Sequence, residues 1–215
     1  PGKKYKKFSL IEIFKKNIRK LFDHFFLYHS FGKKLLLKSG ISSKNITVVT
    51  NVGDIKKFFK LSKLQIPKTK AKKKLGLTNN LTLLFIGALD KNKKPLKLFE
   101  IKESLDLKIN LIFLGKGPLL NEIRKYKSGD PNILVPGHIN SNIELYLSAS
   151  DVLIVPGRGG VNISESLAFG LPVIVHQADG IEYDLIINGK NGFILPNNKT
   201  ETYCSAIFKI LSNEF

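Results

Sequence analysis

One stretch of the chain combines a glycine-rich turn, an arginine and a carboxylate in an order that suits the binding of an anion and a diol. Residues 150–176 read SDVLIVPGRGGVNISESLAFGLPVIVH. The apolar run Val152–Val155 predicts a strand that ends at a Pro-Gly turn. Apolar residues at helical spacing then predict a helix over 161–169, which Gly170 ends in a left-handed conformation. A second strand is expected at Val173–Val175.

The turn of this stretch, Gly157–Gly160, supplies the chemistry. Its glycines leave backbone N–H groups bare at the positive end of a helix that begins near Val161, an arrangement that binds phosphates. Arg158 adds a fork of donors for phosphate oxygens. Glu165 lies about 7 Å further along the helix, which is too far for the phosphate but suits the hydroxyls of a ribose. A glycine turn without a ligand and a solvated Glu165 are the alternatives that this local pattern leaves open.

The composition is that of a globular domain with an uneven charge. The chain has 215 residues, 43% of them hydrophobic, and a net charge of +18. Residues 1–75 hold 21 lysines and arginines against 3 acids, whereas residues 76–215 hold 14 of each. The basic third therefore favours an anionic partner, namely a lipid surface, a phosphorylated substrate or nucleic acid. A solvated lysine-rich face is the alternative.

Several protein classes are excluded or disfavoured. No apolar run approaches the ~20 residues of a membrane span, and no secretory signal is present. The single cysteine, Cys204, rules out a disulfide framework and fits a cytoplasmic location. Because the chain begins with Pro1 rather than methionine, we expect it to be a fragment that lacks a preceding part.

The first 75 residues are expected to begin with helices. Apolar residues spaced three and four apart predict an amphipathic helix over residues 8–30. A short helix follows at Gly32–Lys38, and the β-branched run Ile46–Val49 predicts a strand. Residues 53–75 mix lysine clusters with Pro67 and are interpreted as a linker or hinge.

From residue 76 onward, strands and helices alternate. Strands are expected at Leu81–Ile86, Ile109–Leu114, Ile133–Val135, Val152–Val155, Val173–Val175 and Phe193–Leu195, and helices at 95–105, 118–127, 141–149, 161–169, 181–188 and 199–212. Ser141 with Glu144, and Asn198 with Glu201, have the spacing of capping boxes. The alternation predicts an α/β fold with a doubly wound parallel sheet, which binds ligands at the carboxyl ends of its strands.

Glycine, lysine and acidic residues gather in the loops that follow these strands. The loops are Gly87–Lys94, Gly115–Pro118, Pro136–Ile139, the glycine turn, and Gln177–Glu182. The dinucleotide pattern G-x-G-x-x-G, the P-loop, a zinc-like grouping and the G-x-S-x-G elbow are all absent. We therefore expect a ligand crevice of another kind. Nucleic acid is disfavoured as a partner because no standard motif for binding it is present.

Taken together, these loops resemble the C-terminal half of a retaining GT-B glycosyltransferase, of the large group that includes capsule, lipopolysaccharide and mannosyl transferases. The similar segments are KNITVVTNVGD (44–54), FIGALDKNKKPLKLFE (85–100), NLIFLGKGPLLNEI (110–123), ILVPGHINSNIELYLSASDVLIVPG (133–157), SESLAFGLPVIV (164–175) and DGIEYDLIINGKNGFILP (179–196). The resemblance implies three parts: a remnant of the acceptor-side domain at 1–52, the linker at 53–75, and a Rossmann-like nucleotide-sugar-binding domain at 76–215.

The resemblance also implies which residues form the site. The implied donor-binding residues are Gly87, Lys93, Gly115, His138, Ile139, Gly157, Arg158, Gly159, Gly160, Val161 and Glu165, of which Lys93 and Glu165 are the implied catalytic residues. Lys93 would hold the departing diphosphate. Glu165 matches the second glutamate of the family's E-x7-E motif, which contacts the ribose. His138 and Ile139 would lie beside the nucleobase.

Two positions depart from the family pattern. The first glutamate of E-x7-E falls on Gly157, and an arginine often found after the first strand is replaced by Ala88. Arg158 is a candidate to replace the lost charge.

The function that follows is transfer of a sugar from a nucleotide-diphosphate sugar to a glycan or lipid-linked acceptor in cell-surface polysaccharide synthesis. The expected reaction retains configuration and needs neither a metal nor a cofactor. The basic residues 1–75 would contact the inner face of a membrane. The alternative is a non-catalytic nucleotide-sugar-binding module that needs a partner domain or subunit.

Overall fold

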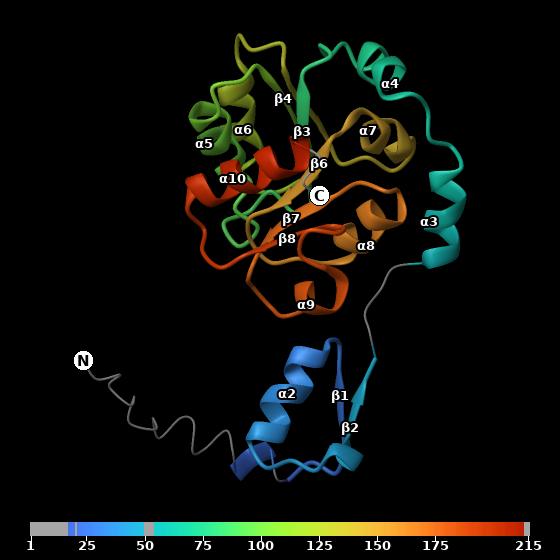
Figure 1. Ribbon diagram of the computed structural model, residues 1–215, viewed down its shortest axis with the longest axis vertical. Helices are drawn as coiled ribbons and strands as arrows, with labels where there is room; N and C mark the ends of the chain where they lie inside the picture. The colour runs from blue at the N-terminus through green and yellow to red at the C-terminus, as the bar shows by residue number, and fades with distance from the viewer. Residues whose placement is uncertain (1–16, 20, 50–53, 213–215) are drawn as a thin grey trace, which may run out of the picture. The chain divides into compact units, whose positions relative to one another are not determined.

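The computed structural model describes residues 17–19, 21–49 and 54–212, and the chain divides into two compact units with a boundary between Asn51 and Val52 (Figure 1). None of the described helices is long and apolar enough to cross a membrane.

The first unit contains a two-stranded parallel sheet and one longer helix. Strand β1 (Phe25–Leu27) pairs with β2 (Ile46–Val48), and Phe25 lies opposite Ile46. Helix α2 (Ser30–Lys38) connects them, followed by the short 3-10 helix η1 (Ser43–Asn45). The helix expected within 32–38 and the strand expected at 46–49 are thus confirmed with small shifts of their ends.

The helix expected over residues 8–30 is wrong in its second half. Residues 8–16 and 20 lie outside the described residues, and residues 17–19 are helical. Beyond them, however, the aromatic-rich segment forms β1, and His29 caps α2 by accepting a hydrogen bond from the Gly32 N–H at 3.0 Å. Aromatic residues favour strands when a partner strand is present, and here β2 provides it from about twenty residues away.

The second unit is built on a six-stranded parallel sheet, which confirms the predicted doubly wound fold. Its strands are β3 (Leu81–Ile86), β4 (Ile109–Leu114), β5 (Ile133–Gly137), β6 (Val152–Val155), β7 (Val173–His176) and β8 (Gly192–Leu195). Their order is β5-β4-β3-β6-β7-β8. The order reverses between β3 and β6, and this switch point is where such sheets bind ligands.

Helices cover both faces of this sheet (Figure 1). Helices α5 (Lys97–Ser104), α6 (Leu120–Lys127) and α10 (Thr200–Leu211) bury one core with Phe85 and Phe113. Helices α4 (Lys68–Lys74), α7 (Ile143–Ala149) and α8 (Val161–Ala168) cover the other core with Leu84 and Ile112. A short helix, α9 (Glu182–Leu185), follows β7. Adjacent strand residues thus point to opposite cores, as the pleat requires.

Both expected capping boxes are wrong. Helix α7 begins after Asn142, whose backbone is left-handed with φ 60° and whose side chain makes no capping bond. Asparagine tolerates this conformation, so the helix start moves past Ser141. Before α10 the position is taken by Lys199, and Asn198 instead accepts a hydrogen bond from the buried Tyr203 hydroxyl at 2.6 Å.

The expected end of α8 is confirmed. Gly170 has φ 78°, and its N–H donates to the Leu167 carbonyl at 3.0 Å. The N–H of Leu171 donates to the Ser166 carbonyl at 2.9 Å. These two bonds form a Schellman motif, which turns the chain directly into β7.

The segment interpreted as a linker, 53–75, is instead largely helical. Helix α3 (Ile55–Ser62) packs on α8, and α4 packs on α7. A buried ion network fixes α4: Lys72, 3% exposed, donates to Asp151 at 2.9 Å and to the Asn80 carbonyl at 2.7 Å. Lys68 also pairs with Asp151. Sequence periodicity misses α4 because ion pairs, rather than an apolar stripe, attach this helix to the sheet.

Asp151 is the centre of this network. It lies just before β6 and also accepts the N–H of Thr82 at the start of β3, at 2.8 Å. Desolvation by burial acts to raise the pKa of Asp151, but hydrogen bonds from Lys68, Lys72 and Thr82 outweigh it and hold the pKa below its usual value. The carboxylate therefore joins α4 to the two strands that flank the switch point.

We predict that Asp151→Asn lowers the free energy of unfolding by about 3 kcal/mol, because Lys72 is left buried without its counter-charge. Urea denaturation at neutral pH measures this. Because the folded pKa of Asp151 is depressed, its contribution is present above the unfolded pKa of about 3.9 and disappears as the pH falls through the folded value. The difference between the two proteins should therefore shrink in acid. The exposed substitution Asp106→Asn is the control, and an equal effect of both changes would contradict the assignment.

Candidate functional site

A cavity of about 540 Å³ lies at the carboxyl ends of β3, β4 and β5. The loops after these strands form much of its wall, and α3, α7 and α8 each add a side chain. Its lining residues are Lys57, Ile86, Gly87, Ala88, Leu114, Gly115, Lys116, His138, Ile139, Asn140, Ile143 and Glu165. The cavity thus occupies the edge of the sheet where the fold predicts a ligand.

The predicted site residues fall into two neighbouring groups. Gly87, Gly115, His138, Ile139 and Glu165 line the cavity. The remaining ones do not line it. They are on the turn that leads into α8, at the first residue of α8, or in contact with the turn: Lys93, Gly157, Arg158, Gly159, Gly160 and Val161. The two groups are joined by a side chain that the sequence reading did not select. The Asn162 amide, in the first turn of α8, donates to the Ile86 carbonyl at 2.7 Å.

Two glycines bring the strand-end loops into contact. A Cβ on Gly115 would lie 1.8 Å from the carbonyl oxygen of Gly87. Gly115 also has φ 150°, so a side chain there would be strained as well as obstructed. Backbone bonds tie the loops further, from Gly87 to Leu114 at 2.9 Å and from Gly115 to Gly137 at 2.8 Å. These contacts make one rigid wall of the cavity.

Glu165 is the carboxylate of the cavity. It is partly buried, and desolvation raises its pKa, while the positive charge of Lys57 on α3 acts in the opposite direction. An ionised carboxylate only accepts hydrogen bonds, so its natural partners in a ligand are hydroxyl or N–H donors. Lys57 was not selected from the sequence, because its proximity to Glu165 arises only when α3 packs on α8.

Lys93 joins the loop after β3 to the turn before α8. Its ammonium donates to the carbonyls of Arg158, at 2.7 Å, and Gly159, at 2.6 Å. Burial lowers the pKa of Lys93, partly offset by the negative charges of Asp179 and Asp90. An ammonium has three donors, so one remains for a ligand.

The loop that carries Lys93 presses against Gly157. A Cβ on Gly157 would lie 2.1 Å from the Asn92 carbonyl oxygen and 2.7 Å from the Lys93 Cα. Asp90 shapes this loop by accepting the N–H groups of Asn92, at 2.8 Å, and Lys93, at 2.9 Å. The missing first glutamate therefore has a physical reason, since no side chain fits at position 157 in this arrangement.

The start of α8 is open to an anion. Gly160 occupies the N-cap position, no side chain caps the helix, and its first turn holds no acid. The unsatisfied N–H groups and the helix dipole favour a negative charge there. Arg158 is exposed on the same turn and lies outside the lining of the cavity.

A buried carboxylate holds the loop after β7 beside this turn. Glu182, 2% exposed, accepts the N–H of Ala178 on one oxygen and the N–H of Gly180 on the other, both at 2.8 Å. The loop carries Asp179, whose charge acts on Lys93. Only the glycine and acid content of this loop marked it in the sequence, and the role of Glu182 depends on burial that a sequence does not reveal.

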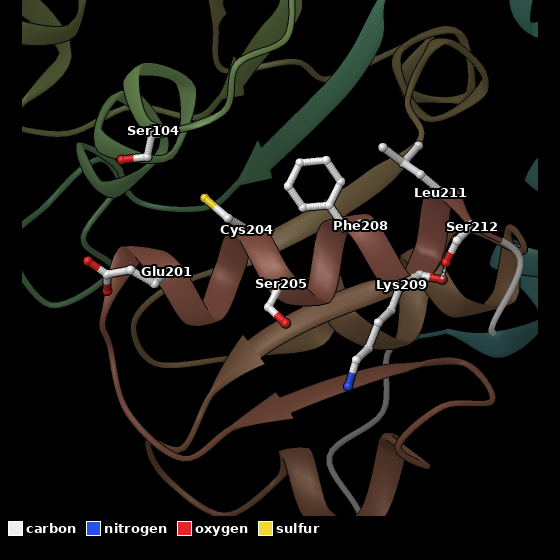
Figure 2. A pocket seen from close by; sticks show the side chains of 8 residues that line it. All are labelled: Ser104, Glu201, Cys204, Ser205, Phe208, Lys209, Leu211 and Ser212. Carbon is white, nitrogen blue, oxygen red and sulfur yellow. Dashed lines mark hydrogen bonds between the residues drawn. The ribbon is translucent and has the colours of Figure 1, made fainter.

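A second cavity, of about 830 Å³, lies along α10 and contains none of the predicted site residues (Figure 2). Figure 2 shows Cys204 and Phe208 on its lining, with Ser104 contributed by α5. Burial raises the pKa of the Cys204 thiol, so the reactive thiolate is disfavoured. We assign this cysteine a packing role.

The fold and the site define a class: a Rossmann-like α/β domain with a cavity at the carboxyl ends of its parallel strands. Comparison with known proteins identifies the family. The sequence model of the family "Glycosyl transferases group 1" matches residues 67–214. The chain belongs to this family.

Relatives give the same picture. The chain is 24% identical over 193 residues to the capsular polysaccharide biosynthesis glycosyltransferase CapM of Staphylococcus aureus, an alignment that covers 85% of this chain and 50% of CapM. Among solved structures, HepE of Anabaena in complex with UDP aligns with a TM-score of 0.73 at 16% identity, over 89% of this chain and 54% of HepE. A glycosyltransferase of Rickettsia africae aligns at 0.72 and 20% identity, over 88% and 53%. The chain thus spans about half the length of the relatives it matches, and its fold agrees with half of a GT-B glycosyltransferase.

We predict that Gly157→Ala lowers the free energy of unfolding by about 2 kcal/mol, because the new methyl group meets backbone atoms of the loop 90–93 that cannot rotate away. Thermal or urea unfolding measures this. Gly159→Ala is a matched control in the same turn, since the atom nearest its Cβ, at 2.7 Å, is the end of the Ile163 side chain. If Gly157→Ala is the better tolerated of the two, the close packing of the two loops is not what excludes a side chain.

Proposed function

We propose that this chain supplies the donor-binding half of a glycosyltransferase that moves a sugar from a nucleotide-diphosphate sugar to a glycan or lipid-linked acceptor. The observation that carries the proposal is the position of Glu165, in a cavity with apolar walls and next to the Lys93–glycine turn. A nucleoside diphosphate has a part for each of these features: a flat base for the apolar walls, a ribose diol for Glu165, and two phosphates for the Lys93–glycine turn. HepE structures in complex with UDP and with UDP-glucose, and the capsular role of CapM, support the same substrate class.

The cavity suits the nucleoside. Ile86, Ile139 and Ile143 offer apolar surface for the base, and His138 is placed at the exposed side of the lining. Glu165 would accept hydrogen bonds from both ribose hydroxyls. The raised pKa of Glu165 expresses the cost of burying its charge, and two hydroxyl donors would offset that cost.

The turn before α8 suits the diphosphate and its departure. When the bond between sugar and phosphate breaks, negative charge grows on the leaving diphosphate. The free donor of Lys93, the guanidinium of Arg158 and the N–H groups at the start of α8 would stabilise that charge. Because these groups supply positive charge without a metal ion, we propose a metal-independent reaction with no cofactor, with retention of configuration as the family resemblance implies.

A second candidate function is a nucleotide-sugar-binding module that depends on a partner domain or subunit for catalysis. The observation that favours it is the close packing at Gly157, which leaves no room for the first glutamate of E-x7-E. The sugar would then be contacted by a residue of a partner domain or subunit in place of that glutamate, or that contact would be absent.

The proposed setting is cell-surface polysaccharide synthesis at the cytoplasmic face of a membrane. The excess positive charge of residues 1–75 would hold the protein near anionic lipids and a lipid-linked acceptor. Nucleic acid is the disfavoured partner, because the proposed site recognises a mononucleotide rather than a polymer.

We predict that calorimetric titration with UDP, GDP and ADP detects binding of one of them, and that Glu165→Gln weakens this binding about tenfold, through loss of charged hydrogen bonds to the ribose. The 2′-deoxynucleotide isolates this contact: it should bind the native chain weakly and lose little further affinity in the variant. Lys93→Ala should weaken binding of the diphosphate more than binding of the nucleoside, because Lys93 has a donor free for phosphate. Glu103→Gln, at an exposed position on α5, is the control.

Two results would contradict the site. One is that none of the nucleotides binds. The other is that Glu165→Gln affects the ribonucleotide and the deoxynucleotide equally, since the carboxylate would then act on the fold rather than on the diol.

The two candidate functions differ in whether the chain by itself transfers sugar to an acceptor. We expect the purified chain to bind the nucleotide sugar without transferring it to an added acceptor, because it corresponds to half of its relatives. A radiolabelled sugar-transfer assay measures this, with the Glu165→Gln variant as the blank. Transfer by the chain alone would rule out the non-catalytic module and establish that this half contains a complete active site.

A further inference from the structure

One face of α3 and the residues just after it combines lysines with exposed apolar side chains. Lys56, Phe59 and Lys60 recur at the three- and four-residue spacing that places them on one side of α3, and Lys63 follows directly after the helix ends at Ser62. All four are exposed, Phe59 by 58%, and Leu64, which follows, is 55% exposed. We call these five residues the α3 surface.

The orientation of the α3 surface is fixed by the opposite side of the helix. Phe58 is buried, with 6% exposure, and Lys57 lines the cavity that contains Glu165, where its positive charge acts on that carboxylate. The helix start is also held, since Asp54 accepts the Lys57 N–H at 3.1 Å. The exposed phenylalanine therefore cannot turn inward without breaking the packing of α3 on α8.

The charge of this region is not balanced locally. Residues 55–75 contain nine lysines and no acid. In the described part of the chain, Lys68 and Lys72 of this segment form ion pairs, both with Asp151. Further exposed lysines on α4, namely Lys70, Lys73 and Lys74, extend the positive charge. Figure 1 shows α3 and α4 along the same edge of the second unit.

We propose that the α3 surface is a docking site for an anionic lipid bilayer, with the lysines at the phosphate headgroups and Phe59 and Leu64 inserted among them. A helix with lysines beside an exposed aromatic and an aliphatic side chain has the character of an interfacial segment. Nucleic acid fits less well. The segment has no arginine to read base edges, and an aliphatic leucine offers no stacking face.

This assignment narrows the membrane contact proposed for residues 1–75 to a single structural element. Because Lys56 and Lys57 are consecutive, the same helix that meets the lipid surface also forms part of the donor cavity. Docking would therefore place the cavity about one helix diameter, roughly 10 Å, from the headgroups. The proposal needs no sugar transfer, so it can fail while the donor site stands, and the reverse holds too.

The absence of tryptophan from the chain allows a direct test of insertion. Phe59→Trp introduces a single tryptophan into the full chain at the α3 surface. Its emission should shift to the blue when vesicles containing phosphatidylglycerol are added, and should not shift with phosphatidylcholine alone. Phe208→Trp is the matched control, because Phe208 is 50% exposed on α10. No shift at position 59, or an equal shift at both positions, would overturn the proposal.

The lysines are tested by vesicle co-sedimentation. We expect Lys56→Gln combined with Lys60→Gln and Lys63→Gln to lower partitioning into anionic vesicles at least about tenfold, since each lysine near such a surface contributes roughly fivefold. The matched control removes three exposed lysines elsewhere, with Lys108→Gln, Lys125→Gln and Lys127→Gln. Equal losses in both triple variants would mean that only net charge matters and would overturn the site. So would a loss of single-stranded oligonucleotide binding in the α3 variant with vesicle binding unchanged.

Discussion

The close approach of two loops is the constraint on which the site depends. The loop after β3 presses on Gly157, and the Lys93 ammonium donates to two carbonyls of the following turn. Together these contacts set where α8 begins and hence where its N–H groups and Glu165 lie. Lys93 thus has two roles: it holds the turn in its conformation, and it is a candidate ligand for phosphate.

The electrostatics of the site follow from this geometry. Lys93 is partly desolvated, and Asp90 and Asp179 favour its charged form, the latter on a loop that the buried Glu182 holds in place. Glu165 is also partly desolvated: burial disfavours its charged form and raises its pKa, while the positive charge of Lys57 favours the charged form. The Lys93 ammonium and the Glu165 carboxylate are therefore both placed near one cavity, and among the described residues no direct ion pair joins them. A ligand with an anionic end and a hydroxyl-bearing end would satisfy both.

At the amino ends of the strands, an ion network attaches the preceding helix α4 to the sheet. Asp151 lies at the amino end of β6 and collects two lysines of α4 as well as an N–H of β3. This network makes α4 part of the domain, and α3 joins it by packing on α8. As a result, the lysine-rich segment is a structured edge of the second unit, and its charge is presented from a fixed surface.

Much of the fold could be predicted from the sequence. Apolar runs and helical periods located every strand of the main sheet, and their alternation predicted its parallel, doubly wound arrangement, because local periodicity and chain connectivity decide those features. The glycines after the strands also indicated where the site would be. Gly170 identified the end of α8, since the Schellman motif depends on residues that are adjacent in sequence.

Other features were decided only by the tertiary structure. Strand β1 lies within a segment with helical periodicity and forms because β2 is there to pair with it. Helix α4 has no apolar stripe and is held by Asp151, about eighty residues away. The electrostatic interaction between Lys57 and Glu165, which line the same cavity, likewise joins distant segments. The sequence by itself determined the order of elements and the chemistry of the loops, because these depend on neighbouring residues. Which charges are buried, which loops touch and which lysines remain exposed depended on packing between segments that only the folded chain brings together.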